Sequence, residues 1–204
     1  DDVLRDAACE RKWVGAVFYG NCGQGYMQGQ HFIRGQVALL PLGLQGIPVI
    51  NVDREFSSEG AYRTWIGGDN YGIGVSAANF LAEQLDCQGN VVEIEGIAGI
   101  SVTTDRIQGF ADTLEALCGD GIEIVAQHPA DFTPDLGLEV MEAILQANPD
   151  IDAVYTHDDD MAEGVVAAIE NAGREDEMIL TGAGGSCAAF DQIESGGLYA
   201  ATYL

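Results

Sequence analysis

Polar and aromatic side chains collect in short segments that each follow an apolar, strand-like run. Asp and Arg side chains offer planar, bidentate hydrogen bonds, and aromatic rings offer a flat and less polar face. Groups of these kinds suit the recognition of a small polar ligand. The segments are Asp53–Arg54, Gly96–Asp105, Asp131–Phe132, His157–Asp160 and Gly182–Ser186.

Basic residues are scarce in this chain. One Lys and seven Arg stand against 33 acidic residues, which gives a formal net charge of -25. On such a surface we expect each remaining cation to have a specific partner, and Arg54 and Arg106 are the two of interest. The acidity itself repels phosphate backbones and anionic lipid headgroups, which argues against nucleic acid or a membrane surface as a partner. No run approaches the ~18 apolar residues of a membrane span.

The elements that must position these segments alternate in type from about residue 47 onward. Strand-like runs separated by segments of helical period indicate βαβ units and a parallel sheet with helices on both faces. In such a sheet, ligands bind beyond the carboxyl ends of the strands. The predicted strands are 47–52, 64–67, 90–94, 122–125, 153–155, 178–180 and 198–203, and the predicted helices are 71–85, 102–117, 135–146, 160–172 and 187–194.

The cysteines give no recognisable pattern. They are odd in number and widely spaced, and no two of them form a CxxC pair. This spacing indicates neither a zinc site nor a disulfide framework, so we expect most of them to be small core residues. They are Cys9, Cys22, Cys87, Cys118 and Cys187.

Several segments, in collinear order from residue 46 to 204, resemble a known family. The segments are Gly46–Arg54, Gly68–Gly72, Glu95–Gly99 with Asp105–Arg106 and Gly109–Phe110, Ala130–Thr133, and Tyr155–Ala162. Each motif alone is weak, but the conjunction is specific. On these segments the chain resembles the type I periplasmic binding proteins, and within them the sugar receptors related to ribose- and galactofuranose-binding proteins.

The resemblance implies an α/β fold of two Rossmann-like parallel-sheet lobes, joined by crossover strands, with the sugar between them. On that pattern residues 1–40 remain unassigned, 41–68 are a remnant of the first lobe, and 69–204 are a nearly complete second lobe up to a crossover strand. Tight capture in this family requires closure of both lobes. We therefore expect the chain as given to bind its sugar weakly, because the first lobe is partial.

The resemblance also assigns the ligand-binding residues. Asp53 and Arg54 would bind ligand hydroxyls from the first lobe. Arg106 and Asp158 would do so from the second lobe, with Phe132 stacked on the sugar ring. The alternatives are a strand-end ion pair between Asp53 and Arg54, a pairing of Arg106 with its neighbour Asp105 or a cap on a helix turn, and a core role for Phe132.

Two positions depart from the ribose-type pattern. Asp158 stands where those members have Asn, and Gly184 stands where they have a ligand-binding Asp. One carboxylate is gained and another is lost, so the identity of the sugar stays open.

The function implied is that of the extracytoplasmic substrate-binding component of an ABC sugar importer. Its ligand would be a monosaccharide and its partners the permease subunits. Neither enzymatic activity, nor a cofactor, nor insertion in a membrane is implied. The location implied is periplasmic or extracellular, and a full-length precursor with a lipid anchor is compatible with it. The alternative is the effector-binding domain of a lac-repressor-like regulator, which shares the fold; no helix-turn-helix precedes the domain.

A metal site and a nucleotide-binding or catalytic site are the two other kinds of site that these residues could form. Asp158–Asp160 beside His157 offer clustered carboxylates for a metal, but adjacent side chains diverge, and we predict that Asp160 caps the following helix. The loop Gly182–Gly185 lacks both the GxGxxG spacing and a P-loop GK[ST]. No GxSxG elbow accompanies the three histidines. The sequence therefore predicts neither a metal ligand nor a catalytic residue.

Overall fold

A computed structural model describes residues 16–19, 49–54 and 62–204. The chain divides into two compact units, Asp1–Gly68 and Asp69–Leu204. The domain boundaries given above stay a prediction, and most of the unassigned segment 1–40 lies outside the described residues. None of the helices in the described ranges is long and apolar enough to cross a membrane.

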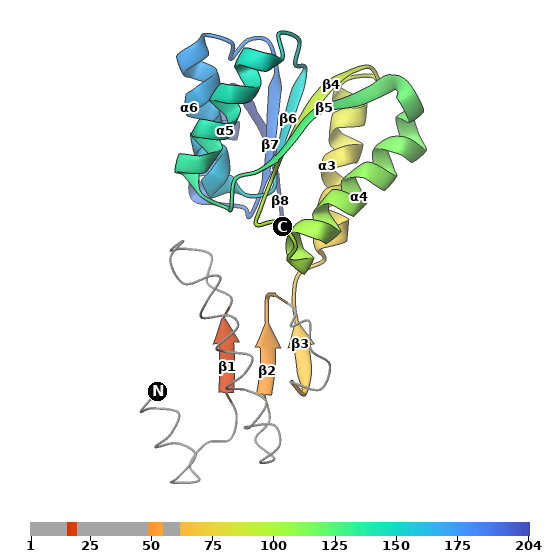
Figure 1. The fold of residues 1–204 in the computed structure, drawn as a ribbon, viewed down its shortest axis with the longest axis vertical. Coiled ribbons are helices and arrows are strands. Elements are labelled where there is room, and N and C mark those ends of the chain that lie inside the picture. The colour runs from red at the N-terminus through yellow and green to blue at the C-terminus, as the bar shows by residue number, and fades with distance from the viewer. Residues whose placement is uncertain (1–15, 20–48, 55–61) are drawn as a thin grey trace. The chain divides into compact units, whose positions relative to one another are not determined.

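The first unit contains a small parallel sheet with the strand order β1-β2-β3 (Figure 1). Its strands are β1 (Ala16–Tyr19), β2 (Val49–Val52) and β3 (Thr64–Ile66). Strands β2 and β3 were expected from the sequence, although the first two residues of the predicted run 47–52 lie outside the described ranges. Strand β1 belongs to the segment that sequence analysis left unassigned.

The second unit contains a five-stranded parallel sheet with the order β5-β4-β6-β7-β8 (Figure 1). All of its strands were expected, and the observed bounds differ from the predicted ones by a few residues at most. This result confirms the α/β parallel-sheet class. The strands are β4 (Gly89–Glu95), β5 (Ile122–Pro129), β6 (Ala153–Thr156), β7 (Ile179–Ala183) and β8 (Tyr199–Tyr203).

Helices cover both faces of this sheet, as the figure shows (Figure 1). One face packs against α3 and α4, and the other against α5 and α6, with α7 adding Ala189. Neighbouring strand residues alternate between the two cores, so Val91 faces α3 and α4 while Val92 faces α5 and α6. The helices are α3 (Asn70–Gln84), α4 (Ser101–Cys118), α5 (Pro134–Ala147), α6 (Asp159–Ala172) and α7 (Cys187–Ser195), and a short 3-10 turn, η1 (Gly119–Gly121), follows α4.

Helices α3 and α4 approach each other through glycines. A Cβ atom at Gly74 would lie 2.2 Å from the carbonyl oxygen of Arg106, and one at Gly109 would lie 2.2 Å from that of Tyr71. A larger residue at either position would push the helices apart. The two glycines therefore fix where α4 places Arg106.

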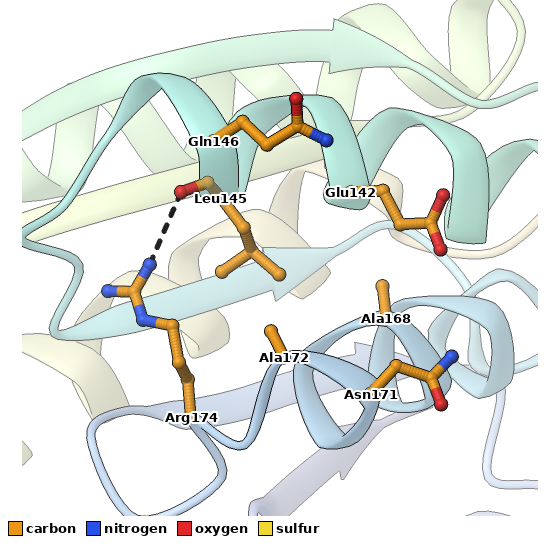
Figure 2. A pocket seen from close by; sticks show the side chains of 7 residues that line it. All are labelled: Glu142, Leu145, Gln146, Ala168, Asn171, Ala172 and Arg174. Carbon is orange, nitrogen blue, oxygen red and sulfur yellow. Dashed lines mark hydrogen bonds between the residues drawn. The ribbon is translucent and has the colours of Figure 1, made fainter.

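Arg174 closes the carboxyl end of α5. Its Nη2 donates to the carbonyl of Pro149 at 2.6 Å and its Nη1 to that of Asn148 at 3.3 Å. A shallow pocket of about 350 Å³ lies beside it between α5 and α6 (Figure 2). Helix α5 ends where the chain turns back into β6, so this pocket belongs to the amino edge of the sheet. The residues that line it are Glu142, Leu145, Gln146, Ala168, Asn171, Ala172 and Arg174.

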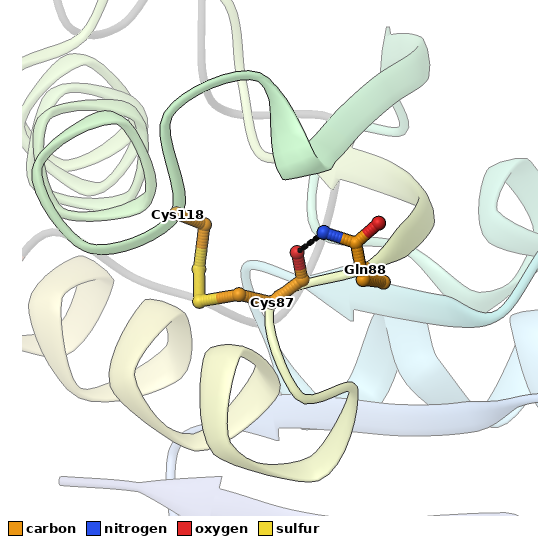
Figure 3. Close-up of a disulfide and its surroundings, with 3 residues drawn as sticks. All are labelled: Cys87, Gln88 and Cys118. Carbon is orange, nitrogen blue, oxygen red and sulfur yellow. Dashed lines mark hydrogen bonds between the residues drawn. A yellow bond between two sulfur atoms is a disulfide. The ribbon is translucent and has the colours of Figure 1, made fainter.

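A disulfide joins Cys87 to Cys118 (Figure 3). The expectation that the cysteines form no disulfide was therefore wrong for this pair. The two residues are 31 positions apart, so no local motif marks them, but the fold brings the segment after α3 against the end of α4, with the Cα atoms 5.0 Å apart. Cys187 is free and exposed. Cys9 and Cys22 lie outside the described residues.

Candidate functional site

Arg106 is held at the carboxyl edge of the sheet by two acceptors from distant segments. Its Nε donates to Oδ1 of Asn70 at 3.0 Å, and its Nη1 donates to the carbonyl oxygen of His157. Asn70 is the first residue of α3, and His157 follows β6 directly. The side chain of Arg106 is half-buried. A guanidinium with two fixed bonds keeps its orientation while its other N–H groups stay available.

Asp158 caps the amino end of α6. Its Oδ1 accepts a hydrogen bond from the backbone N–H of Met161 at 3.1 Å. The prediction that Asp160 is the cap was wrong, because the helix begins one residue earlier and Asp160 lies exposed in its first turn. Burial raises the pKa of Asp158 to about 6, against a weaker downward effect of the Arg106 charge. Arg106 therefore lies within electrostatic reach of this carboxyl group.

Phe132 lies over the backbone of Gly96. A Cβ atom at Gly96 would stand 1.9 Å from the ring atom Cζ of Phe132, so only glycine leaves room for the ring. Both Asp131 and Phe132 have left-handed backbone angles, with φ of 51° and 60°. This tight turn after β5 directs the ring toward the loop that follows β4. Phe132 is half-buried.

His157 links these three residues, although it was not predicted as a site residue. Its ring is fully buried, accepts the N–H of Gly96 at Nδ1 (3.3 Å) and lies 2.9 Å from Oε1 of Glu93 through Nε2. Burial lowers the pKa of His157 to about 3, helped by the Arg106 charge. The ring is therefore neutral, and because Nδ1 is the acceptor, Nε2 carries the proton and donates to Glu93.

Glu93 is a fully buried carboxyl group in the middle of β4. Burial raises its pKa to about 8, and a hydrogen bond from Nε2 of Gln127 at 2.7 Å acts against this rise. It belongs to one row of polar side chains that crosses four strands in register. The only sign of this buried carboxyl group in the sequence was a charged residue inside the mainly apolar run Val91–Glu95. The row consists of Gln127, Glu93, Tyr155 and Thr181.

A second network surrounds Asp159, the first residue of α6. Its Oδ1 accepts from the hydroxyls of Tyr199 and Thr202, each at 2.7 Å, and its Oδ2 accepts from the backbone N–H of Ser186 at 2.7 Å. A Cβ atom at Gly182 would stand 1.9 Å from the Tyr199 hydroxyl. Gly182, near the end of β7, thus leaves room for the hydrogen bond between the Tyr199 hydroxyl and the Asp159 carboxylate.

Asp53 and Arg54 lie together in the first unit. Asp53 has a φ of 74°, its N–H donates to the carbonyl of Ile66 at 2.8 Å, and its own carbonyl accepts from Nε1 of Trp65 at 2.9 Å. Nε of Arg54 is 3.9 Å from Oδ2 of Asp53, so the ion pair that was the alternative to ligand binding is present at long range. Arg54 is buried, with 6% of its surface exposed.

The arrangement brings together three of the five predicted residues. Arg106, Phe132 and Asp158 meet around Gly96 and His157 in the second unit, and Asp53 and Arg54 are neighbours in the first. The roles of all five as ligand-binding residues stay a prediction. Within the part of the chain that the structure describes, no three His, Cys, Asp or Glu side chains are placed to hold a metal ion. The pocket of Figure 2 contains none of the predicted residues.

Comparison with known proteins identifies the class. Residues 44–204 match the model of the periplasmic binding protein domain, so the chain belongs to this family and the resemblance is confirmed. The ribose import binding protein of Bacillus subtilis is 38% identical over 64% of this chain and 41% of its own length. The D-apiose import binding protein of Actinobacillus succinogenes is 34% identical over 100% of this chain and 62% of its own length.

Solved structures agree with this result. An ABC transporter periplasmic solute binding protein from Actinobacillus succinogenes with bound D-allose is 26% identical, with a TM-score of 0.78 over 96% of this chain and 67% of that one. The myo-inositol binding protein of Caulobacter is 25% identical, with a TM-score of 0.80 over 96% of this chain and 63% of that one. The chain therefore spans about two fifths to two thirds of the length of these relatives.

Proposed function

We propose that this chain is part of an extracytoplasmic solute-binding protein of an ABC importer and that its ligand is a monosaccharide, bound without turnover. The observation that carries the proposal is the guanidinium of Arg106, which two hydrogen bonds hold within electrostatic reach of the carboxyl group of Asp158. The family relationship and the names of the relatives, which are ribose, apiose, allose and galactofuranose binding proteins, support it. The permease subunits of the importer are the partners that this function requires.

The chemistry of the half-site in the second unit fits a polyhydroxylated ring. Arg106 uses two N–H groups within the protein, and a guanidinium has five, so further N–H groups can donate to hydroxyl oxygens. Asp158 uses one lone pair for its helix cap and can accept from ligand hydroxyls with the others. Phe132 offers its ring to the less polar face of the sugar.

The first unit would complete the site in the whole protein. Asp53 and Arg54 form a second carboxylate–guanidinium pair directly after β2, at the carboxyl end of a parallel strand. Ligands of open parallel sheets bind at that end. We assign residues 41–68 to the first lobe and 69–204 to the second, with the sugar between them. Two-lobed closure would then desolvate both faces of the ring.

An oxidising compartment suits the disulfide between Cys87 and Cys118. Disulfides persist in periplasmic and extracellular proteins and are rare in the cytosol. We therefore place the protein outside the cytoplasm, in the periplasm or on the cell surface through a lipid anchor. Peptide mapping of the protein from its native compartment should recover the cross-linked pair. Two free thiols at these positions would argue against this location.

The test of the proposed function is sugar binding by the chain and by variants at its two second-unit arginines. NMR titration detects the weak binding that we expect, and a panel of monosaccharides, amino acids and nucleotides gives the ligand class. In the whole two-lobed protein, Arg106→Ala should weaken sugar binding by roughly 2–5 kcal/mol, because ligand hydroxyls lose a charged donor in a desolvated site. Arg106→Lys should not restore it fully, since an ammonium lacks the planar fork.

Arg174→Ala is the matched control. Arg106 and Arg174 are the basic residues of the range 69–204, and Arg174 binds the end of α5 at the other edge of the sheet. Its loss should lower stability and leave sugar affinity unchanged. Binding of an amino acid or nucleotide with no response to any sugar would overturn the proposed function. If the Arg106→Ala variant and the parent bound sugar with equal affinity, the ligand-binding role proposed for Arg106 would be wrong.

A further inference from the structure

The orientation of Arg106 depends on a main-chain atom. The carbonyl oxygen of His157 accepts from Nη1 of Arg106, and it lies just past the end of β6, where the regular strand pairing stops. The N–H of the same residue donates to the carbonyl of Ile94 at 3.0 Å. A substitution at residue 157 cannot remove this main-chain carbonyl. It can move the carbonyl, because the position of the backbone depends on the contacts that the side chain of residue 157 makes.

The side chain of His157 is held on all sides by the protein. Gly96 donates to Nδ1, Glu93 accepts from Nε2, and the ring of Tyr155 packs beside it with the centroids 5.0 Å apart. Glu93 is in turn fixed by Gln127 on the neighbouring strand. The histidine therefore ties the loop after β6 to β4, to β5 and to the loop after β4.

The same histidine lies between the residues proposed to touch the ligand. Its Gly96 partner is the residue that Phe132 covers, its carbonyl orients Arg106, and its chain neighbour is Asp158. A displacement of this ring would move all three ligand groups together.

We propose that His157 is a positioning residue for ligand binding: its ring, hydrogen-bonded to both Gly96 and Glu93, fixes the carbonyl that orients Arg106. This proposal rests on the proposed sugar-binding function. His157 does not touch the ligand itself, because its side chain is fully buried.

A purely space-filling role does not explain the choice of residues. Burying an imidazole and a carboxyl group costs free energy unless every polar atom has a partner, and an apolar pair of similar volume avoids that cost. Here both ring nitrogens and both oxygens of Glu93 have partners. A fully satisfied polar network specifies one geometry more sharply than apolar packing does.

The experiment compares His157→Leu with His157→Gln in the full 204-residue chain. Leu removes both ring hydrogen bonds, whereas the amide of Gln keeps a donor that reaches Glu93. Tyr199→Phe is the matched control, because it removes a buried hydrogen bond at the same sheet edge without touching Arg106. If His157→Leu does not fold, Glu93→Met replaces it, since Met fills the volume and takes away the acceptor of Nε2.

Two readouts are measured on each variant. The first is solvent exchange of the Arg106 Nε–H signal in nitrogen-15 NMR, with the Arg174 Nε–H, bonded to Glu177, as the internal reference. The second is affinity for the sugar that the parent chain binds. We expect His157→Leu to accelerate Arg106 exchange and weaken sugar binding by about tenfold or more, with His157→Gln recovering most of both and Tyr199→Phe changing neither.

The first readout keeps the two proposals separable. If no sugar binds to the parent chain, the proposed function fails, and Arg106 exchange still decides whether His157 positions the guanidinium. Unchanged Arg106 exchange in His157→Leu would overturn the positioning role, whatever the sugar result. Sugar affinity that stays within about twofold of the parent in the same variant would also overturn it.

Discussion

Two hydrogen-bond networks lie at the carboxyl edge of the same sheet, and they differ in whether they leave hydrogen-bond donors available for a ligand. The network of His157 extends from Glu93 to Arg106, whose guanidinium keeps unused N–H groups. The network of Asp159 joins Tyr199, Thr202 and the N–H of Ser186, and all of these bonds stay within the protein. The first network is suited to present a group to a ligand, and the second fastens β8 to the start of α6.

The difference also explains the run of three acids. Asp158 caps α6, Asp159 turns toward β8, and Asp160 is exposed in the first helical turn. Three adjacent side chains with three different directions cannot converge on one ion. Each has its own task, and the contrast between the networks can be tested one residue at a time.

Asp159→Ala should have the largest effect on stability. It removes the acceptor of two hydroxyls and one backbone N–H, so we expect a loss of about 3–5 kcal/mol in the free energy of unfolding. Urea denaturation followed by circular dichroism measures it. Asp160→Ala is the control, because that exposed side chain should change stability little. A loss below about 1 kcal/mol for Asp159→Ala would mean that this network does not fasten β8.

Gly182→Ala tests the same network from the opposing side. The added Cβ would stand 1.9 Å from the Tyr199 hydroxyl and 2.6 Å from Oδ1 of Asp159, so the bond between them must break or shift. We expect a loss of about 1–3 kcal/mol, as for other overpacked sites. Gly197→Ala, where no atom lies within 4 Å, is the matched control. Equal unfolding midpoints for the two variants would contradict the close packing around Gly182.

The His157 network should respond to pH. The pKa of Glu93 rises from 4.5 to about 8 on folding, so its contribution to stability is present below pH 4.5 and is lost as the pH rises through 8. The pKa of His157 falls from 6.5 to about 3, so its contribution is present above pH 6.5 and is lost as the pH falls through 3. The two effects oppose each other between pH 4.5 and 6.5.

Above that interval the Glu93 effect stands alone. From pH 6.5 to 8 the parent chain should lose about 1 kcal/mol per pH unit relative to Glu93→Gln, which does not titrate. Urea denaturation of both proteins across this range gives the difference. Glu123→Gln, an exposed substitution on the neighbouring β5, controls for the loss of one acidic side chain. A Glu93→Gln curve that runs parallel to the parent curve would contradict the raised pKa of Glu93.

The sequence predicted most of the second unit because its signals are local. Apolar runs and helical periods placed every strand of that unit and its α-helices within a few residues, whereas Arg106, Phe132 and Asp158 were named by the family resemblance. The cap of α6 was misplaced by two residues, because Asp158 and Asp160 are equally good capping types and only the backbone distinguishes them.

The remaining errors concern contacts between distant residues. The disulfide of Cys87 and Cys118 depends on two helix ends that meet only in the folded chain. The partnership of Glu93 with His157 spans 64 positions and requires the register of β4 against β6. A polar residue within an apolar strand predicts that a polar side chain is buried there, but it does not identify the residue to which that side chain is hydrogen-bonded.

The polar row across four strands has a consequence for folding. Side chains of a strand alternate between faces, so a slip of β4 by one residue would move Glu93 from the side of α3 and α4 into the apolar core that holds Val92 and Ile94. A carboxyl group there would have no Gln127 or His157 beside it. Misaligned sheets would thus carry a penalty that the correct alignment avoids. Burial of Glu93 therefore favours the observed register of β4 over one shifted by a single residue.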